Sequence, residues 1–135
     1  MDVDRNMRNA DRGIPNDFIE IVDLVEKATK DNRISWTEDP PGSGKIIIHF
    51  ERFQIALWLE DESGEGESSY VLTTVFFEVQ SDKGHPVGGF FTDHFGNMPK
   101  NDAMVRLERL YFDAFTQSRN LDNALKEIKQ ELRIK

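Results

Sequence analysis

The chain has 135 residues, of which 38% are hydrophobic and 31% are charged, and its formal net charge is −8. A chain of this length is expected to form one domain around a single core. It contains no cysteine, which excludes disulfides, thiolate metal ligands and thiol catalysis. No apolar run is long enough for a signal peptide or a bilayer span, so we expect no membrane association and predict a cytoplasmic protein.

The first part of the chain predicts a flexible arm followed by a helix. Residues 1–15 are polar with alternating charge, and we place the boundary of a single domain, 16–135, directly after them. Apolar residues then recur at three- and four-residue spacing and predict a helix over residues 17–30, with Asn16 as its N-cap. The apolar positions are Phe18, Ile21, Val22, Val25 and Ala28.

Residues 40–45, Pro-Pro-Gly-Ser-Gly-Lys, end like a phosphate-binding loop. The full pattern needs a glycine where this chain has Asp39 and a hydroxyl where it has Ile46. The isoleucines that follow predict a strand, so no helix N-terminus is available to receive a phosphate. We therefore interpret the segment as a turn and expect no nucleotide or other cofactor.

The next segment predicts antiparallel sheet. Apolar side chains occupy even positions over residues 46–50 and odd positions over residues 53–59. Because strand side chains alternate between faces, the change of phase at residues 51–52 requires a turn or a bulge. We favour a hairpin with its tip there, and a bulged continuous strand is the alternative. In either case Gln54, Trp58 and Glu60 fall on the face opposite the apolar positions.

An acidic stretch begins at Glu60, Asp61 and Glu62, and we interpret residues 61–69 as a loop. Its negative charge would repel nucleic-acid phosphates and favour a basic protein partner. Nucleic acid is therefore not expected among the partners.

Residues 70–80 are apolar on both faces, which is typical of a central strand. A turn over residues 81–86 and a returning strand over residues 87–92 are predicted to follow. The strand contains Gly88 and Gly89, which indicate a bulge, a kink, or the close approach of a backbone or a ligand.

The last part of the chain is predicted to be helical, starting at a cap on Asn101. Two apolar stripes meet at residues 118–120, which leaves open whether there is one helix or two. The complete order of elements predicts an α+β fold. It has an N-terminal helix, a roughly four-stranded antiparallel sheet of hairpins, and one or two C-terminal helices packed on one sheet face.

The histidines give little support for catalysis. No pair of them has the spacing of a metal site, and the serines lie in acidic surroundings without a nucleophile elbow. Asp93 and His94 place a carboxylate beside an imidazole at the end of a predicted strand. We assign no catalytic residue and no metal ligand, and favour a non-enzymatic protein while leaving an enzyme open.

The predicted helices cover only one face of the sheet, and the other face carries Trp58. We therefore predict a non-enzymatic protein-interaction module of the adaptor, chaperone, immunity or inhibitor type. It would bind a protein partner, favoured to be basic, or a second copy in a homodimer. The alternative is a small-ligand-binding or enzymatic domain with a cleft between the sheet and the C-terminal helices near residues 88–94. The predicted binding residues are Gln54, Trp58, Glu60, Asp61, Glu62, Gly88, Gly89, Asp93 and His94.

Overall fold

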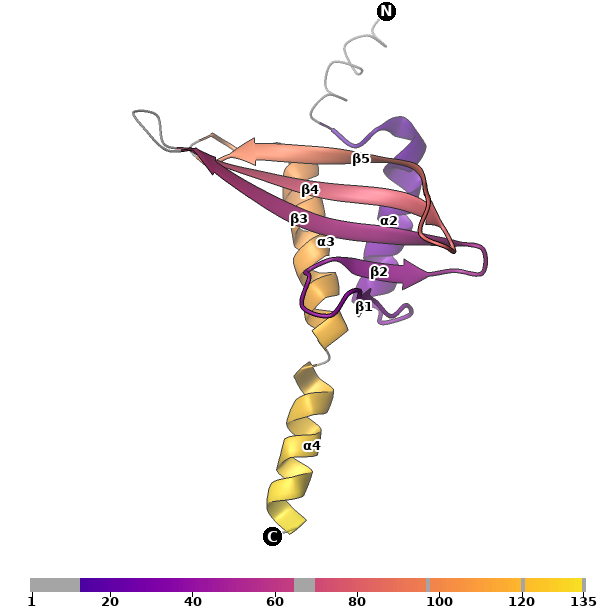
Figure 1. Ribbon diagram of the computed structural model, residues 1–135, viewed down its shortest axis with the longest axis vertical. Helices are drawn as coiled ribbons and strands as arrows, with labels where there is room; N and C mark the ends of the chain where they lie inside the picture. The colour runs from indigo at the N-terminus through magenta and orange to yellow at the C-terminus, as the bar shows by residue number, and fades with distance from the viewer. Residues whose placement is uncertain (1–12, 65–69, 97, 120, 135) are drawn as a thin grey trace, which may run out of the picture.

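The computed structural model describes residues 13–64, 70–96, 98–119 and 121–134, and it is drawn as a ribbon in Figure 1. It confirms the α+β class, with five strands where about four were predicted. The additional strand, β1, is only two residues long and lies at one edge of the sheet. In chain order the elements are α2 (Asn16–Lys30), β1 (Thr37–Glu38), β2 (Ile46–His49), β3 (Phe53–Gly64), β4 (Tyr70–Ser81), β5 (Pro86–Phe95), α3 (Asp102–Arg119) and α4 (Leu121–Ile134).

The five strands form one antiparallel sheet whose spatial order follows the chain order. The turn between β2 and β3 contains residues 51–52 and is closed by the Phe50 N–H, which donates to the Phe53 carbonyl at 2.8 Å. This confirms the hairpin and excludes the bulged continuous strand. The longest pairing is between β3 and β4, over twelve residues from Phe53–Ser81 to Gly64–Tyr70.

Helices α2 and α3 both pack on one face of the sheet and lie behind it in Figure 1, where α4 extends away from the body. The core lies between these two helices and the sheet. No described helix covers the opposite face, which we call the outer face. The largest fully buried side chains are Phe77, Ile46, Leu57, Met104, Leu107, Val22 and Val75.

The two predicted helix caps have different outcomes. The cap predicted at Asn16 is wrong, because Pro15 has the extended backbone (ψ 146°) of an N-cap and Asn16 is already helical. Ile14 is buried in the core, so the packed chain includes residues of the segment predicted as an arm. The predicted cap at Asn101 is confirmed, since its Oδ1 accepts the Met104 N–H at 2.7 Å.

Two polar anchors tie α2 to α3. Arg106 of α3 contacts the carboxylates of Asp23 and Glu26 of α2, both at 2.5 Å, and the hydrogen bond to Glu26 is the main cause of its raised pKa. The indole N–H of the buried Trp36 donates to Thr29 Oγ1 at 3.0 Å. Its backbone N–H donates to Gln117 Oε1 at 2.9 Å. These bonds hold the two helices side by side across the strands.

The glycine-rich loop over residues 40–45 binds a carboxylate of the same chain, that of Glu38. The Gly44 N–H donates to the Glu38 carboxylate at 2.7 Å, and Arg119 lies 3.3 Å from the same carboxylate. The Tyr111 hydroxyl donates to the Gly44 carbonyl at 2.6 Å. Gly42 and Gly44 have positive φ angles of 85° and 82°, which glycine adopts without strain. The segment that resembles a phosphate-binding loop is therefore a glycine turn whose backbone N–H binds the Glu38 carboxylate.

This turn predicts a pH-dependent contribution to stability. The hydrogen bond from Gly44 is the largest cause that lowers the pKa of Glu38 below its usual value of 4.5. A lowered pKa in the folded state stabilises the fold above the unfolded-state value, and the effect is lost as pH falls through the folded-state pKa. We expect Glu38→Gln to unfold at lower urea concentration than the wild type at neutral pH, and the difference to disappear well below pH 4.5. A difference independent of pH would show that the charge of Glu38 has no role.

Candidate functional site

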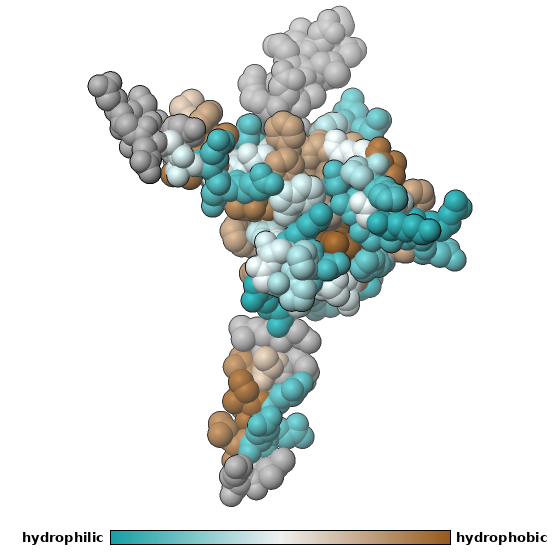
Figure 2. All heavy atoms as spheres, viewed as in Figure 1, coloured by the Kyte–Doolittle hydropathy of each residue, from teal (hydrophilic) through white to brown (hydrophobic). Residues whose placement is uncertain are grey.

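A row of three aromatic side chains crosses the outer face. The strand register places Trp58, Phe76 and Phe91 directly opposite one another on β3, β4 and β5. The rings of Trp58 and Phe76 are stacked, with centroids 4.9 Å apart, and those of Phe76 and Phe91 are 5.8 Å apart. Phe91 is 59% exposed, and Figure 2 shows apolar patches among polar side chains on this side of the molecule. We call these three residues the aromatic row.

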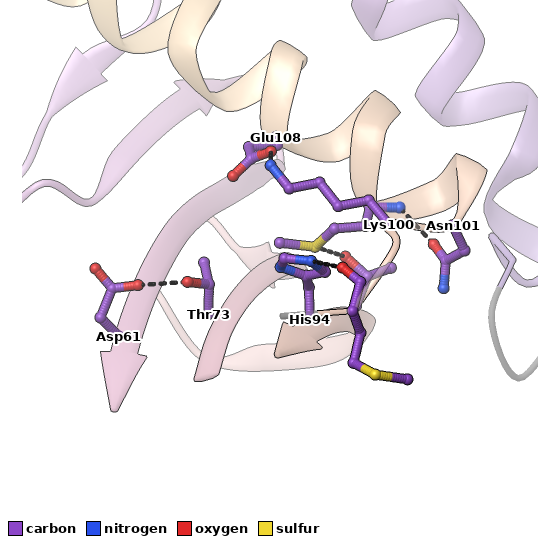
Figure 3. Close-up of polar contacts among 9 residues, drawn as sticks. Asp61, Thr73, His94, Lys100, Asn101 and Glu108 are labelled. Atoms are coloured by element: carbon purple, nitrogen blue, oxygen red, sulfur yellow. Dashed lines mark hydrogen bonds and ion pairs between the residues drawn. The ribbon is translucent and has the colours of Figure 1, made fainter. Parts of the chain in front are cut away.

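The acidic residues predicted to lie in a loop belong partly to the sheet. Glu60, Asp61 and Glu62 lie in β3 and pair with β4, so the predicted start of the loop at residue 61 is wrong. Cross-strand pairing outweighs the low strand preference of acidic residues here. Glu60 and Glu62 lie on the outer face. Asp61 faces the other way and accepts a hydrogen bond from Thr73 at 2.8 Å (Figure 3). The remainder of the predicted loop, residues 65–69, lies outside the described residues.

Carboxylates share the outer face with the aromatic row. Glu60 lies two residues after Trp58 on the same face of β3 and accepts the Trp58 indole N–H at 3.0 Å. The Lys45 ammonium lies over the Trp58 ring, 4.9 Å from its centroid, a geometry in which the ring face attracts a cation. By strand alternation, four carboxylates of the described strands lie on the same face as the row, at or near its ends. They belong to Glu60, Glu62, Glu78 and Asp93.

The glycine pair borders a hollow of about 220 Å³ on the outer face, lined also by the aromatic row. A Cβ on Gly89 would overlap the Phe77 carbonyl oxygen and lie 2.9 Å from the Glu78 Cα, whereas a Cβ on Gly88 would meet nothing within 4 Å. Of the predicted reasons for the pair, close approach of a neighbouring backbone thus applies at Gly89, and an irregularity of the bulge type also occurs, since the β4–β5 register shifts between Val79 and Gln80 beside Gly88.

Gln54 lies on the outer face but is buried. Its Nε2 donates to Oε1 of Gln80 at 2.6 Å, and both amides are less than 7% exposed. The turn over residues 82–84 lies beside this pair and borders a second hollow of about 400 Å³. Gln54 therefore lies at the base of that second hollow. It is not part of the exposed surface near Trp58.

The residues predicted to share a cleft near the C-terminal helices do not converge. Successive strand residues face opposite ways, so Asp93 lies on the outer face and His94 on the helix side. The His94 Nε2 is hydrogen-bonded to the Met98 carbonyl, as Figure 3 shows, and Gly88 and Gly89 border the outer face. The carboxylate and the imidazole therefore do not form a dyad.

Comparison with known protein families, with curated proteins and with solved structures finds no match for this chain. No group of three or more potential metal ligands occurs among the described residues. Of the helices in the described ranges, none is both long and apolar enough to cross a membrane. A functional proposal therefore depends on the chemistry of the outer face.

The glycine pair provides a test of this geometry. We expect Gly89→Ala to destabilise the fold by about 1–3 kcal/mol, because its methyl group would overlap the β4 backbone. Gly88→Ala is the matched control and is expected to change stability by less than about 1 kcal/mol. Urea unfolding of the two variants measures the difference. Equal stabilities would contradict the close approach at Gly89.

Proposed function

We propose that the protein is a non-enzymatic interaction module that docks a basic protein segment on the outer face of its sheet. The observation that carries the proposal is the aromatic row, which lies on a sheet face without a covering helix in the described chain and shares that face with four carboxylates. This surface suits an adaptor, chaperone, immunity or inhibitor protein.

The arrangement favours a partner that presents arginine or lysine. An exposed ring face attracts a cation, and Lys45 of the chain itself already uses the Trp58 ring in this way. Phe91 offers a second and more exposed ring in the same row. The neighbouring carboxylates add hydrogen-bond acceptors for a guanidinium and raise the local concentration of basic partners.

A small-ligand or catalytic function has less support. The groups predicted for it, Asp93 and His94, lie on opposite faces, and His94 is bonded to a backbone carbonyl. The hollow beside Gly88 and Gly89 is small and lies on the same outer face as the aromatic row. It is better suited to one side chain of a docked segment than to a separate ligand.

Phe91→Lys tests the proposal, because it replaces an exposed ring of the aromatic row with a positive charge that repels a basic segment, and it does not disturb the core. We expect it to weaken partner binding at least about tenfold, as expected for loss of an aromatic anchor. A photoreactive phenylalanine analogue at position 91, introduced in cells, identifies the partner by cross-linking. Affinity is then measured by fluorescence polarisation with arginine-rich segments of that partner. The wild-type affinity should fall as ionic strength rises.

Phe112→Lys is the matched control. Phe112 is 52% exposed, comparable to Phe91, and it lies on α3 on the other side of the sheet. We expect this variant to bind like the wild type. Equal loss of binding in both variants, or a partner cross-linked equally from positions 91 and 112, would contradict docking on the outer face.

A further inference from the structure

Helix α4 carries an apolar stripe that contacts no core. Leu125, Ile128 and Leu132 share one side of the helix and are 44%, 54% and 70% exposed. Figure 2 shows the stripe along one side of α4, with polar side chains along the other. All its described side chains, residues 124–133, are exposed. An isolated helix of this length is marginal in water, so the stripe calls for a covering surface.

The same chain has an apolar groove on the helix side of the sheet. It has a volume of about 470 Å³ and lies between α2 and the end of the sheet formed by the β2–β3 turn. Four of its large side chains are 39–54% exposed, namely Ile21, Leu24, Phe50 and Phe53. Its lining is Ile21, Leu24, Val25, Ala28, Arg33, Ile34, Phe50, Phe53, Ile55 and Val79, in which arginine is the one charged type.

The groove lies where a third helix could pack on the sheet, next to α2 and in the same layer as α2 and α3. At about 100° per residue, Ile21 and Ala28 lie on the flank of α2 opposite Glu26, which faces α3 through Arg106. Along β4, Val75 and Phe77 lie in the core beneath the helices, whereas Val79 lines the groove. A helix placed there would continue the existing layer on the sheet.

In the structure α4 does not use this position, because it continues away from the body after α3 (Figure 1). One residue separates the bounds of α3 and α4. The end of α3 lies next to the groove, since Gln117 Nε2 donates to the carbonyl of the groove residue Ile34 at 2.9 Å. With α4 projecting in this way, its apolar stripe is presented to another molecule.

We propose that α4 of one copy occupies the apolar groove of a second copy, in a reciprocal dimer with two such contacts. In a twofold dimer the stripe of each copy lies in the groove of the other, so both stripes and both grooves are covered by two identical contacts. Charge does not oppose it. Arg33, the charged residue of the groove lining, is paired with Asp31 at 3.6 Å, and the described side chains of α4 include three bases and two acids. This contact uses a surface different from the outer face of the proposed function.

Cross-linking between single-cysteine variants tests which surfaces meet, because the native chain has no cysteine. Leu24→Cys and Ile128→Cys are mixed, allowed to exchange and treated with a short bismaleimide. We expect a covalent heterodimer joined between positions 24 and 128. Phe112→Cys, an exposed position on α3, is the matched control and is expected to give no such product with Ile128→Cys. Linkage of Ile128→Cys only to itself would indicate a coiled coil of two α4 helices and overturn the proposal.

Light scattering measures the consequence for mass. We expect the wild type to be a dimer, and Leu24→Glu and Ile128→Glu each to weaken dimerisation at least about tenfold while circular dichroism shows an unchanged fold. Phe91→Lys should remain a dimer, which separates this contact from the outer face. A monomeric wild type, or a dimer broken by Ile128→Glu but not by Leu24→Glu, would overturn the proposal.

Discussion

The twelve-residue pairing of β3 with β4 is the constraint on which the rest of the structure depends. Strands of this length extend about 37–40 Å, whereas two helices packed side by side cover only about 20 Å. The helix side of the sheet is therefore left uncovered at both ends. One end is polar, with Asp61 bonded to Thr73. The other is apolar, with Phe53 and Val79, and it forms the groove.

The same pairing determines the outer face, because it aligns the aromatic side chains of neighbouring strands. Stacking in the row removes part of each ring from water while leaving Phe91 exposed. The extension of β3 beyond the helices places Glu60 and Glu62 beside that row. An aromatic surface on a sheet edge region favours self-association, and carboxylates on the same face oppose aggregation through repulsion between copies.

Local patterns predicted the class of fold, the hairpin at residues 51–52 and the cap at Asn101, since each depends on residues close together in sequence. The cap at Asn16 was missed locally, by one residue, because Pro15 takes the N-cap position. The other features that were missed depend on distant neighbours. The acids of β3 are strand residues because β4 pairs with them, and Gln54 is buried because of Gln80 and the turn beyond it. The groove also could not be predicted, because it joins α2 to a turn some thirty residues later in the chain.

The two proposed surfaces are compatible because they lie on opposite sides of the same strands. The groove faces the helix side of β3, whereas Trp58 faces the outer side. A dimer joined through α4 would leave both aromatic rows free. Two equal docking surfaces on one particle bind a partner with repeated basic segments more tightly than either alone, because the second contact forms at a high effective concentration. Dimerisation would thus strengthen recognition by an acidic face whose individual contacts are modest and sensitive to salt.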